Sequence, residues 1–220
     1  MNKAWNEADD LPERLAGTLA SGLGEAGRAR LVNRRRFEPE LSFGRHAGPA
    51  PATARAAAVM ILMVRRGRRW HLPLTMRPAT LAQHGGQISL PGGTIETGES
   101  SCDAAVRELA EELGVDSAIQ PLGQLHDCYV FASNFIVTPW VAAVRSEPTW
   151  RLDAQEVERV VEMPLESLLD PTTVGTLTIE RGPLVFRAPC YCLGDDCVWG
   201  TTSVILGELA EALREVGDAS

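Results

Sequence analysis

The sequence predicts an α/β domain, because apolar strand segments alternate with helices that carry terminal caps. Residues 56–64 form a continuous apolar run, which fits a strand buried at the centre of a sheet. Residues 100–114 predict a helix, since Ser100 and Asp103 have capping-box spacing and Gly114 suits the end of the helix. Within it, apolar residues recur at helical spacing and are expected to face a core: Val106, Leu109, Ala110 and Leu113.

Residues 1–50 are predicted to form an N-terminal extension packed on a single domain that comprises residues 51–220. A short helix is expected over residues 11–23. The polar stretch after it contains three consecutive arginines, Arg34 to Arg36, which are expected to lie on the solvated surface.

Strand signals continue on both sides of the capped helix. Further strands are expected at residues 70–77, 122–131, 135–144, 172–181 and 184–193. Residues 132–134 and Gly182–Pro183 supply turns between two pairs of them. A proline-started helix is expected near Pro164, and an amphipathic helix closes the chain.

The composition indicates a globular protein whose acidity is concentrated in one region. The 220 residues are 45% hydrophobic and 23% charged, and they can bury a sizeable core. The net charge of −8 argues against broad nucleic-acid binding, which needs a basic surface. No apolar run approaches the ~20 residues of a membrane span. The N-terminus lacks a signal-peptide layout and five cysteines fit reduced thiols, so a cytoplasmic location is expected.

The predicted helix carries a cluster of acids behind a glycine loop. Glu108, Glu111 and Glu112 lie at i, i+3 and i+4 and therefore share one side of the helix. A solvated helix face is the ordinary explanation for such a run. However, Gly92, Gly93 and Gly98 bracket the preceding loop, and glycines allow close approach to a ligand. Clustered carboxylate oxygens suit Mg²⁺ or Mn²⁺ rather than zinc.

This segment resembles the Nudix box, the pattern G-x5-E-x7-R-E-U-x-E-E-x-G-U in which U is aliphatic. The nine specified positions are all filled, by Gly93, Glu99, Arg107, Glu108, Leu109, Glu111, Glu112, Gly114 and Val115. The resemblance implies a Nudix α/β/α sandwich with a mixed central sheet and a loop–helix–loop catalytic motif. It also implies metal-dependent hydrolysis of a nucleoside diphosphate linked to another moiety, with a small-molecule nucleotide as substrate. A homodimer is compatible with this fold.

The roles of the box residues follow from the resemblance and from their chemistry. Glu108, Glu111, Glu112 and the backbone carbonyl of Gly92 are the expected metal ligands. Arg107 and Glu99 are expected to pair and to clamp the loop onto the helix. Glu111, or a loop glutamate such as Glu156, could deprotonate the attacking water; the base is not assigned. Outside the box, Glu156 or Glu158 could bring a further carboxylate to the metal site.

The segment before the box resembles coenzyme A pyrophosphatases. Matching positions are Leu74, Thr75, Arg77, Leu81, His84, Gly86, Gln87, Pro91, Gly92 and Gly93. Arg77 is the expected phosphate contact, and Gly86 and Gln87 are expected to shape the adjacent substrate loop. The products from coenzyme A would be 4′-phosphopantetheine and adenosine 3′,5′-bisphosphate. The departures from the family pattern are Pro78, Ala82 and Leu90, and Ala82 lacks the family's basic side chain.

Two alternatives to coenzyme A hydrolysis remain open. One is a Nudix hydrolase for another nucleotide: a dinucleotide, a nucleotide sugar or an oxidised nucleotide. The other is a non-catalytic nucleotide-binding module, against which the intact glutamate set argues. Three cysteines near the C-terminal end, Cys190, Cys192 and Cys197, are also candidate metal ligands. They lack the paired spacing typical of structural zinc, so free thiols are expected there. His84 is expected to anchor its glycine-rich loop.

Overall fold

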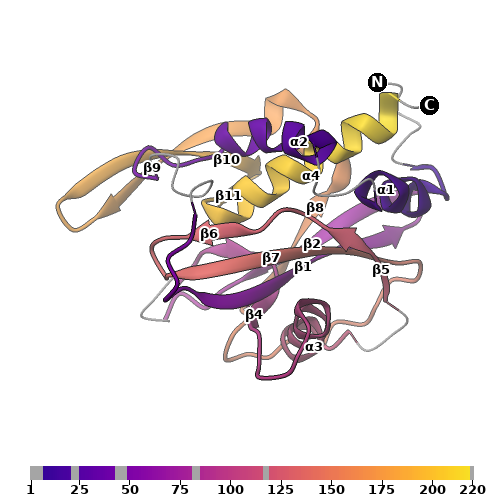
Figure 1. Ribbon diagram of the computed structural model, residues 1–220, viewed down its shortest axis with the longest axis horizontal. Helices are drawn as coiled ribbons and strands as arrows, with labels where there is room; N and C mark the ends of the chain where they lie inside the picture. The colour runs from indigo at the N-terminus through magenta and orange to yellow at the C-terminus, as the bar shows by residue number, and fades with distance from the viewer. Residues whose placement is uncertain (1–6, 21–24, 43–48, 81–84, 116–118, 219–220) are drawn as a thin grey trace.

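The computed structural model describes residues 7–20, 25–42, 49–80, 85–115 and 119–218. A mixed sheet separates helix α3 (Ser101–Leu113) from a layer of three helices on its other face (Figure 1). These three helices are α1 (Leu11–Ala20), α2 (Glu25–Arg35) and α4 (Thr201–Asp218). The layers form the α/β sandwich that the sequence predicts.

Strand β1 (Arg55–Arg66) lies at the centre of the sheet, as its apolar run predicts. It runs parallel to β7 (Phe135–Val144) along one edge. Its other edge is shared, since β4 (Gly92–Thr94) pairs with its first half and β2 (Arg69–Met76) pairs with its end. Both of these pairings are antiparallel, so the sheet is mixed.

The other strands extend this eight-stranded sheet outward. Next to β2 lie β3 (Ile88–Ser89) and β8 (Arg159–Pro164). The single strand expected over residues 122–131 is wrong: two short strands, β5 (Gln120–Gln124) and β6 (Cys128–Val130), each pair with β7. The register shifts between Pro121 and Gly123, because a proline has no N–H to donate to the ladder.

The alternating side chains of β1 build two cores, one on each face of the sheet. Ala58, Met60, Leu62 and Val64 pack with the buried residues of α3. The intervening residues, which include Ile61 and Met63, pack with α1 and α4. Because both faces are covered, the strand has the near-continuous apolar sequence of a central strand.

The helical layer contains one element that the sequence interpretation missed. Helix α2 occupies the polar stretch that was expected to be a surface segment. Arg34 is 5% exposed and forms an ion pair with the buried Glu208 of α4, at 2.5 Å, so its expected place on the solvated surface is wrong. Asn33 donates to the carbonyl of Gly207 at 2.9 Å, which ties α2 to α4. Among the residues described, no helix combines the length and apolar character needed to cross a bilayer.

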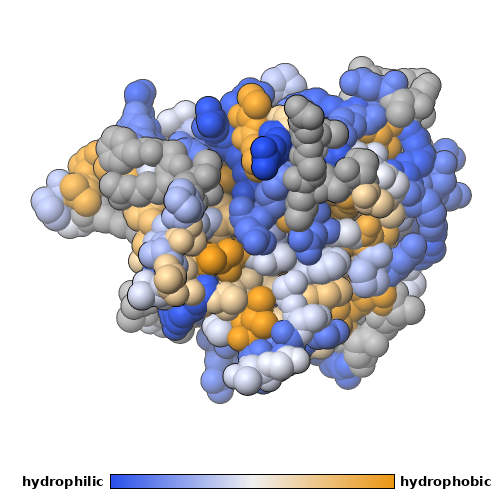
Figure 2. Space-filling model, in the orientation of Figure 1, coloured by the Kyte–Doolittle hydropathy of each residue, from blue (hydrophilic) through white to orange (hydrophobic). Residues whose placement is uncertain are grey.

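A second sheet follows β8 through two short 3₁₀ helices, η3 (Leu165–Leu168) and η4 (Pro171–Thr173). It contains β9 (Val174–Arg181), β10 (Leu184–Leu193) and β11 (Asp196–Trp199), in the order β11-β10-β9. The predicted hairpin about Gly182–Pro183 is confirmed, and it projects from the body of the molecule (Figure 1). Its tip bears exposed apolar residues, Leu184 and Val185, and hydrophobic surface is visible at this end in Figure 2.

Candidate active site

The glycine strand that precedes α3 is fixed directly to the centre of the sheet. Gly92 pairs with Val59 in β1, and the N–H of Met60 donates to the carbonyl of Pro91 at 2.9 Å. A Cβ atom on Gly92 would lie 2.3 Å from the carbonyl oxygen of Ala58. Glycine is therefore required at this position for the strand to approach β1.

Helix α3 begins and ends where its caps predict. The N–H of Asp103 donates to the Ser100 hydroxyl at 3.1 Å. Gly114 adopts a left-handed conformation, with φ of 68°, and its N–H donates to the carbonyl of Ala110. Leu109 and Leu113 are fully buried as expected, whereas Val106 and Ala110 are half-buried.

The i, i+3, i+4 spacing suggested that Glu112 lies on the same side of α3 as the other two acids. In the structure, Glu112 is buried instead of exposed. It is 5% exposed, and its Oε1 accepts a hydrogen bond of 3.0 Å from the N–H of Gly92. Burial raises the pKa of this carboxyl to about 7, and the negative charges of Glu156 and Glu108 add to the rise. The Gly92 hydrogen bond and the charge of Arg77 oppose it.

Glu108 packs against the other glycine of the strand. A Cβ atom on Gly93 would lie 2.4 Å from its Oε1, so the missing side chain makes room for the carboxylate. Burial raises the pKa of Glu108, while Arg107 opposes the shift. Glu111, one turn beyond Arg107, has a side chain that is 59% exposed. Solvent exposure of the three box glutamates therefore increases from Glu112 through Glu108 to Glu111.

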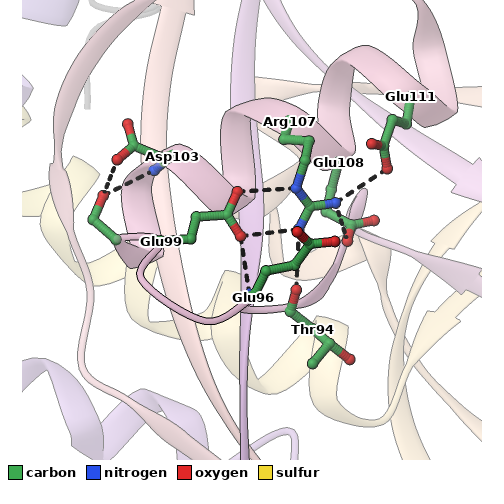
Figure 3. A network of polar contacts seen from close by, with 8 residues as sticks. Thr94, Glu96, Glu99, Asp103, Arg107, Glu108 and Glu111 are labelled. Atoms are coloured by element: carbon green, nitrogen blue, oxygen red, sulfur yellow. Dashed lines mark hydrogen bonds and ion pairs between the residues drawn. The ribbon is translucent and has the colours of Figure 1, made fainter.

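Arg107 connects the loop to the helix through a network shown in Figure 3. Its Nε and Nη2 donate to the two oxygens of Glu99 at 2.9 and 3.1 Å, which confirms the expected pair. It also donates to the carbonyl of Thr94 and to the carboxylates of Glu108 and Glu111. The Arg107 hydrogen bonds, followed by one from the N–H of Glu96, lower the pKa of Glu99. The guanidinium fork thus orients three glutamates and a loop carbonyl together.

A segment outside the box brings a further carboxylate to this cluster. The N–H groups of Arg151 and Asp153 donate to the carbonyls of Leu113 and Glu112, at 2.9 and 3.1 Å, so residues 151–157 follow the end of α3. Glu156 in this segment lies close enough to raise the pKa of both Glu108 and Glu112. Glu156 was a candidate from the sequence, but no sequence signal indicated that its segment is anchored to the last carbonyls of the helix through Arg151 and Asp153.

The other candidate glutamate and the expected substrate residues lie at the end of β2. Glu158 donates its N–H to Met76 and accepts from the N–H of Ala79 at 3.3 Å, which places it beside the Arg77 loop. Arg77 is joined through its backbone to both Gln87 and Gly86, each at 3.0 Å. Its charge acts on Glu112, so this loop borders the acidic cluster. Leu81, Ala82 and His84 lie outside the described residues.

The donor set fits a hard divalent cation. Glu108, Glu112 and the exposed Glu156 offer carboxylate oxygens, and burial together with the neighbouring negative charges raises the pKa of Glu108 and Glu112. A cation among them would relieve this repulsion, and oxygen ligands are those that Mg²⁺ and Mn²⁺ prefer. One buried and one half-buried acid next to a glycine strand, on a mixed sheet between helices, are the arrangement expected of a metal-assisted hydrolase site.

Comparison with known proteins assigns the family. A model of the NUDIX domain matches residues 54–179, so the chain belongs to the Nudix hydrolases, enzymes that cleave pyrophosphate bonds and generally use divalent cations. The chain is 35% identical over 158 residues to a protein called "Uncharacterized Nudix hydrolase NudL" from Salmonella paratyphi B, a match that covers 71% of this chain and 81% of the relative.

Two solved structures confirm the fold. The Nudix hydrolase RenU from M. smegmatis has a TM-score of 0.51 at 15% identity, covering 83% of this chain and 94% of that one. A MutT/nudix family protein from Enterococcus faecalis also has a TM-score of 0.51, at 16% identity, covering 89% of this chain and 75% of that one.

Proposed function

We propose that this enzyme hydrolyses the pyrophosphate bond of coenzyme A or its acyl derivatives, with Mg²⁺ or Mn²⁺, giving 4′-phosphopantetheine and adenosine 3′,5′-bisphosphate. The observation that carries the proposal is the buried Glu112 carboxylate, fixed by the Gly92 N–H beside Glu108 and Glu156. The choice of coenzyme A is supported by the residues that precede the box, which resemble coenzyme A pyrophosphatases and include Arg77.

Glu108 and Glu112 are the main proposed metal ligands, with Glu111 and the carbonyl of Gly92 completing the set. When bound, the metal neutralises phosphate charge and lowers the pKa of its water. Arg107 and Glu99 act as positioning residues, because they fix the loop and orient Glu108 and Glu111. Arg77 is proposed to bind a phosphate oxygen, with Gly86 and Gln87 shaping its loop.

We assign the general base to Glu156 rather than to Glu111. Both side chains are exposed, but the Glu111 carboxylate is engaged by Arg107 at 3.1 Å, whereas the charge of Glu156 acts on Glu112 as well as on Glu108. Glu156 would accept a proton from the attacking water while the oxygen of that water forms a bond to phosphorus. The bridging P–O bond then breaks, and the leaving phosphate keeps the electron pair.

Product analysis across a panel of diphosphate compounds tests the substrate. We expect coenzyme A and acyl derivatives to be cleaved with Mg²⁺ or Mn²⁺, and Glu112→Gln to lose at least about a hundredfold in kcat/KM, since a metal supplies several kcal/mol. Cleavage of a dinucleotide, a nucleotide sugar or an oxidised nucleotide in place of coenzyme A would overturn the substrate; the absent base at Ala82 makes these the competitors. Wild-type turnover in Glu112→Gln would overturn the metal-ligand role.

The assignment of the base has its own test. Glu156→Gln is expected to lower kcat by about 10²–10⁴-fold while leaving Mn²⁺ affinity close to that of the wild type. Glu111→Gln is the comparison variant: Glu111 is proposed to bind the metal and not to act as the base, so at saturating Mn²⁺ this variant should retain a larger share of kcat. A larger loss of kcat in Glu111→Gln than in Glu156→Gln would reverse the assignment.

We further propose that the enzyme works in the cytoplasm. The sulfur atoms of Cys190, Cys192 and Cys197 lie within 4.8 Å of one another as free thiols, which a reducing compartment preserves.

A further inference from the structure

Three cysteines meet on one face of the second sheet, in a part of the chain that the proposed function does not use. Cys190 and Cys192 are two residues apart on β10 and therefore point to the same face. Cys197 lies directly opposite Cys192 on β11, because Gly194 and Asp195 form a two-residue turn between the strands. The sequence spacing looked unsuitable for a metal, but the hairpin register makes the three thiols neighbours. They lie beyond residue 179, where the family match ends.

The sulfur geometry resembles that of a thiolate metal site. The Sγ atoms of Cys190 and Cys192 are 3.8 Å apart, and all three sulfurs lie within 4.8 Å of one another. A tetrahedral zinc ion with Zn–S bonds of about 2.3 Å separates its sulfur ligands by about 3.8 Å. Small rotamer adjustments of Cys197 would therefore complete three corners of a tetrahedron.

The surroundings leave room for this cluster and give it access to solvent. Gly175 on β9 pairs with Cys190, and a Cβ atom there would lie 2.5 Å from the sulfur of Cys192. Cys190 is buried, whereas Cys192 and Cys197 are half-buried, so an ion could enter from their side and keep a fourth ligand from solvent. Burial raises the pKa of Cys190 to about 12, and the neighbouring thiols add to it. Ion binding must therefore release protons.

We propose that Cys190, Cys192 and Cys197 form a second metal site, separate from the carboxylates of the active site, that binds one thiophilic ion of the Zn²⁺ class. Thiolates select such ions, whereas the oxygen donors of α3 suit Mg²⁺ or Mn²⁺. The site fixes β11 to β10. Because Asp196 on β11 forms an ion pair with Arg159 on β8 at 2.5 Å, a bound ion also stabilises the contact between the two sheets. The proposal does not depend on the substrate or on catalysis.

Zinc binding to the reduced full-length protein tests the site. In excess Mg²⁺, which occupies the carboxylates, the wild type is expected to bind one more Zn²⁺ per chain than Cys192→Ser or Cys197→Ser, and each variant should weaken that site about a hundredfold or more. Cys102→Ser is the matched control, since Cys102 is also half-buried but lies on α3, and it should bind zinc as the wild type does. Co²⁺ should give the full thiolate charge-transfer band in the wild type and in Cys102→Ser, but not in Cys192→Ser or Cys197→Ser. Equal zinc content in the wild type and both cluster variants would overturn the proposal.

A measurement on the wild type alone guards against variants that fail to fold. Alkylation of the native protein, read by mass spectrometry, should show Cys192 and Cys197 protected by Zn²⁺ while Cys102 reacts at an unchanged rate. Zinc should also raise the melting temperature, because it binds the folded state. Unchanged alkylation of Cys192 and Cys197 with zinc present would contradict the site.

Discussion

At the scale of single residues, Glu112 is the most informative group in the molecule. Its helix spacing alone suggested an exposed acid, yet it is 5% exposed and its pKa is about 7 instead of the ordinary 4.5. A buried carboxylate destabilises the folded protein when it ionises without a cation nearby. We therefore expect Glu112 to lower the stability of the metal-free protein, a cost that functional sites often carry and that fits its proposed role as a metal ligand.

The raised pKa of Glu112 gives a pH-dependent prediction for the metal-free protein. Because the folded-state pKa exceeds the unfolded value, the protonated group stabilises the fold fully below pH 4.5, and this contribution is lost as pH rises through 7. In chelator at pH 8, Glu112→Gln should be more stable than the wild type by about 3 kcal/mol. The difference should shrink toward zero below pH 4.5 and should fall when Mg²⁺ is added. Urea unfolding across pH measures it, and a wild type that is the more stable protein at pH 8 would contradict the buried charge.

At the scale of elements, the two glycines of β4 have different functions. A side chain at Gly92 would meet the main chain of β1, which cannot move aside, and φ there is 155°. The three atoms nearest to a Cβ at Gly93 all belong to the carboxylate end of Glu108, which can rotate away. The same substitution at adjacent positions should therefore affect stability in one case and metal binding in the other.

We expect Gly93→Ala to weaken Mn²⁺ binding about 10–100-fold while unfolding of the metal-free protein changes by less than about 1 kcal/mol. Gly92→Ala should instead destabilise the fold by at least about 3 kcal/mol, since strand pairing is disrupted. Each variant serves as the control for the other. Calorimetric Mn²⁺ titration and urea unfolding measure the two effects. Equal losses of stability in Gly92→Ala and Gly93→Ala would show that the Glu108 side chain cannot move aside.

The sequence predicted those elements whose signals are local. The caps of α3, the central strand β1 and the β9–β10 hairpin were all identified from residues close together in the chain. Helix α2 was missed because its sequence is polar and rich in arginine, and Arg34 is buried through partners far away in the chain, among them Glu208 in α4. The depth of Glu112 and the position of Glu156 depend on β4 and on residues 151–157 respectively, which helix periodicity does not reveal. Long-range contacts decided each of these differences.

At the scale of the whole molecule, a buried polar network joins helix α2 to the rest of the domain. Arg34 of α2 pairs with Glu208 of α4 and donates to the carbonyls of His126 and Asp127, which lie between β5 and β6. Glu208 also contacts Nδ1 of His126 at 2.7 Å. We propose that residues 1–50 are an extension of the Nudix domain that this network holds in place.

Substitution of Arg34 tests the network. Arg34→Leu leaves the Glu208 carboxylate, which is 1% exposed, without its ion-pair partner, so we expect a loss of about 3–5 kcal/mol at neutral pH. The double variant Arg34→Leu/Glu208→Leu should recover part of this loss, because it removes the buried charge as well. Chemical unfolding of both variants measures how much of the lost free energy of unfolding the second substitution restores. A change within about 0.5 kcal/mol for Arg34→Leu would contradict a stabilising role for the pair.

We propose above all that the acids of α3 and the strand β4 hold a divalent cation for pyrophosphate hydrolysis. Anomalous diffraction from crystals soaked in Mn²⁺ tests it most directly, because it locates the ion without reference to activity. We expect an anomalous peak in contact with the carboxylates of Glu108 and Glu112 and close to the carbonyl of Gly92. A fully occupied peak elsewhere, with Glu112 still bonded only to the Gly92 N–H, would contradict it.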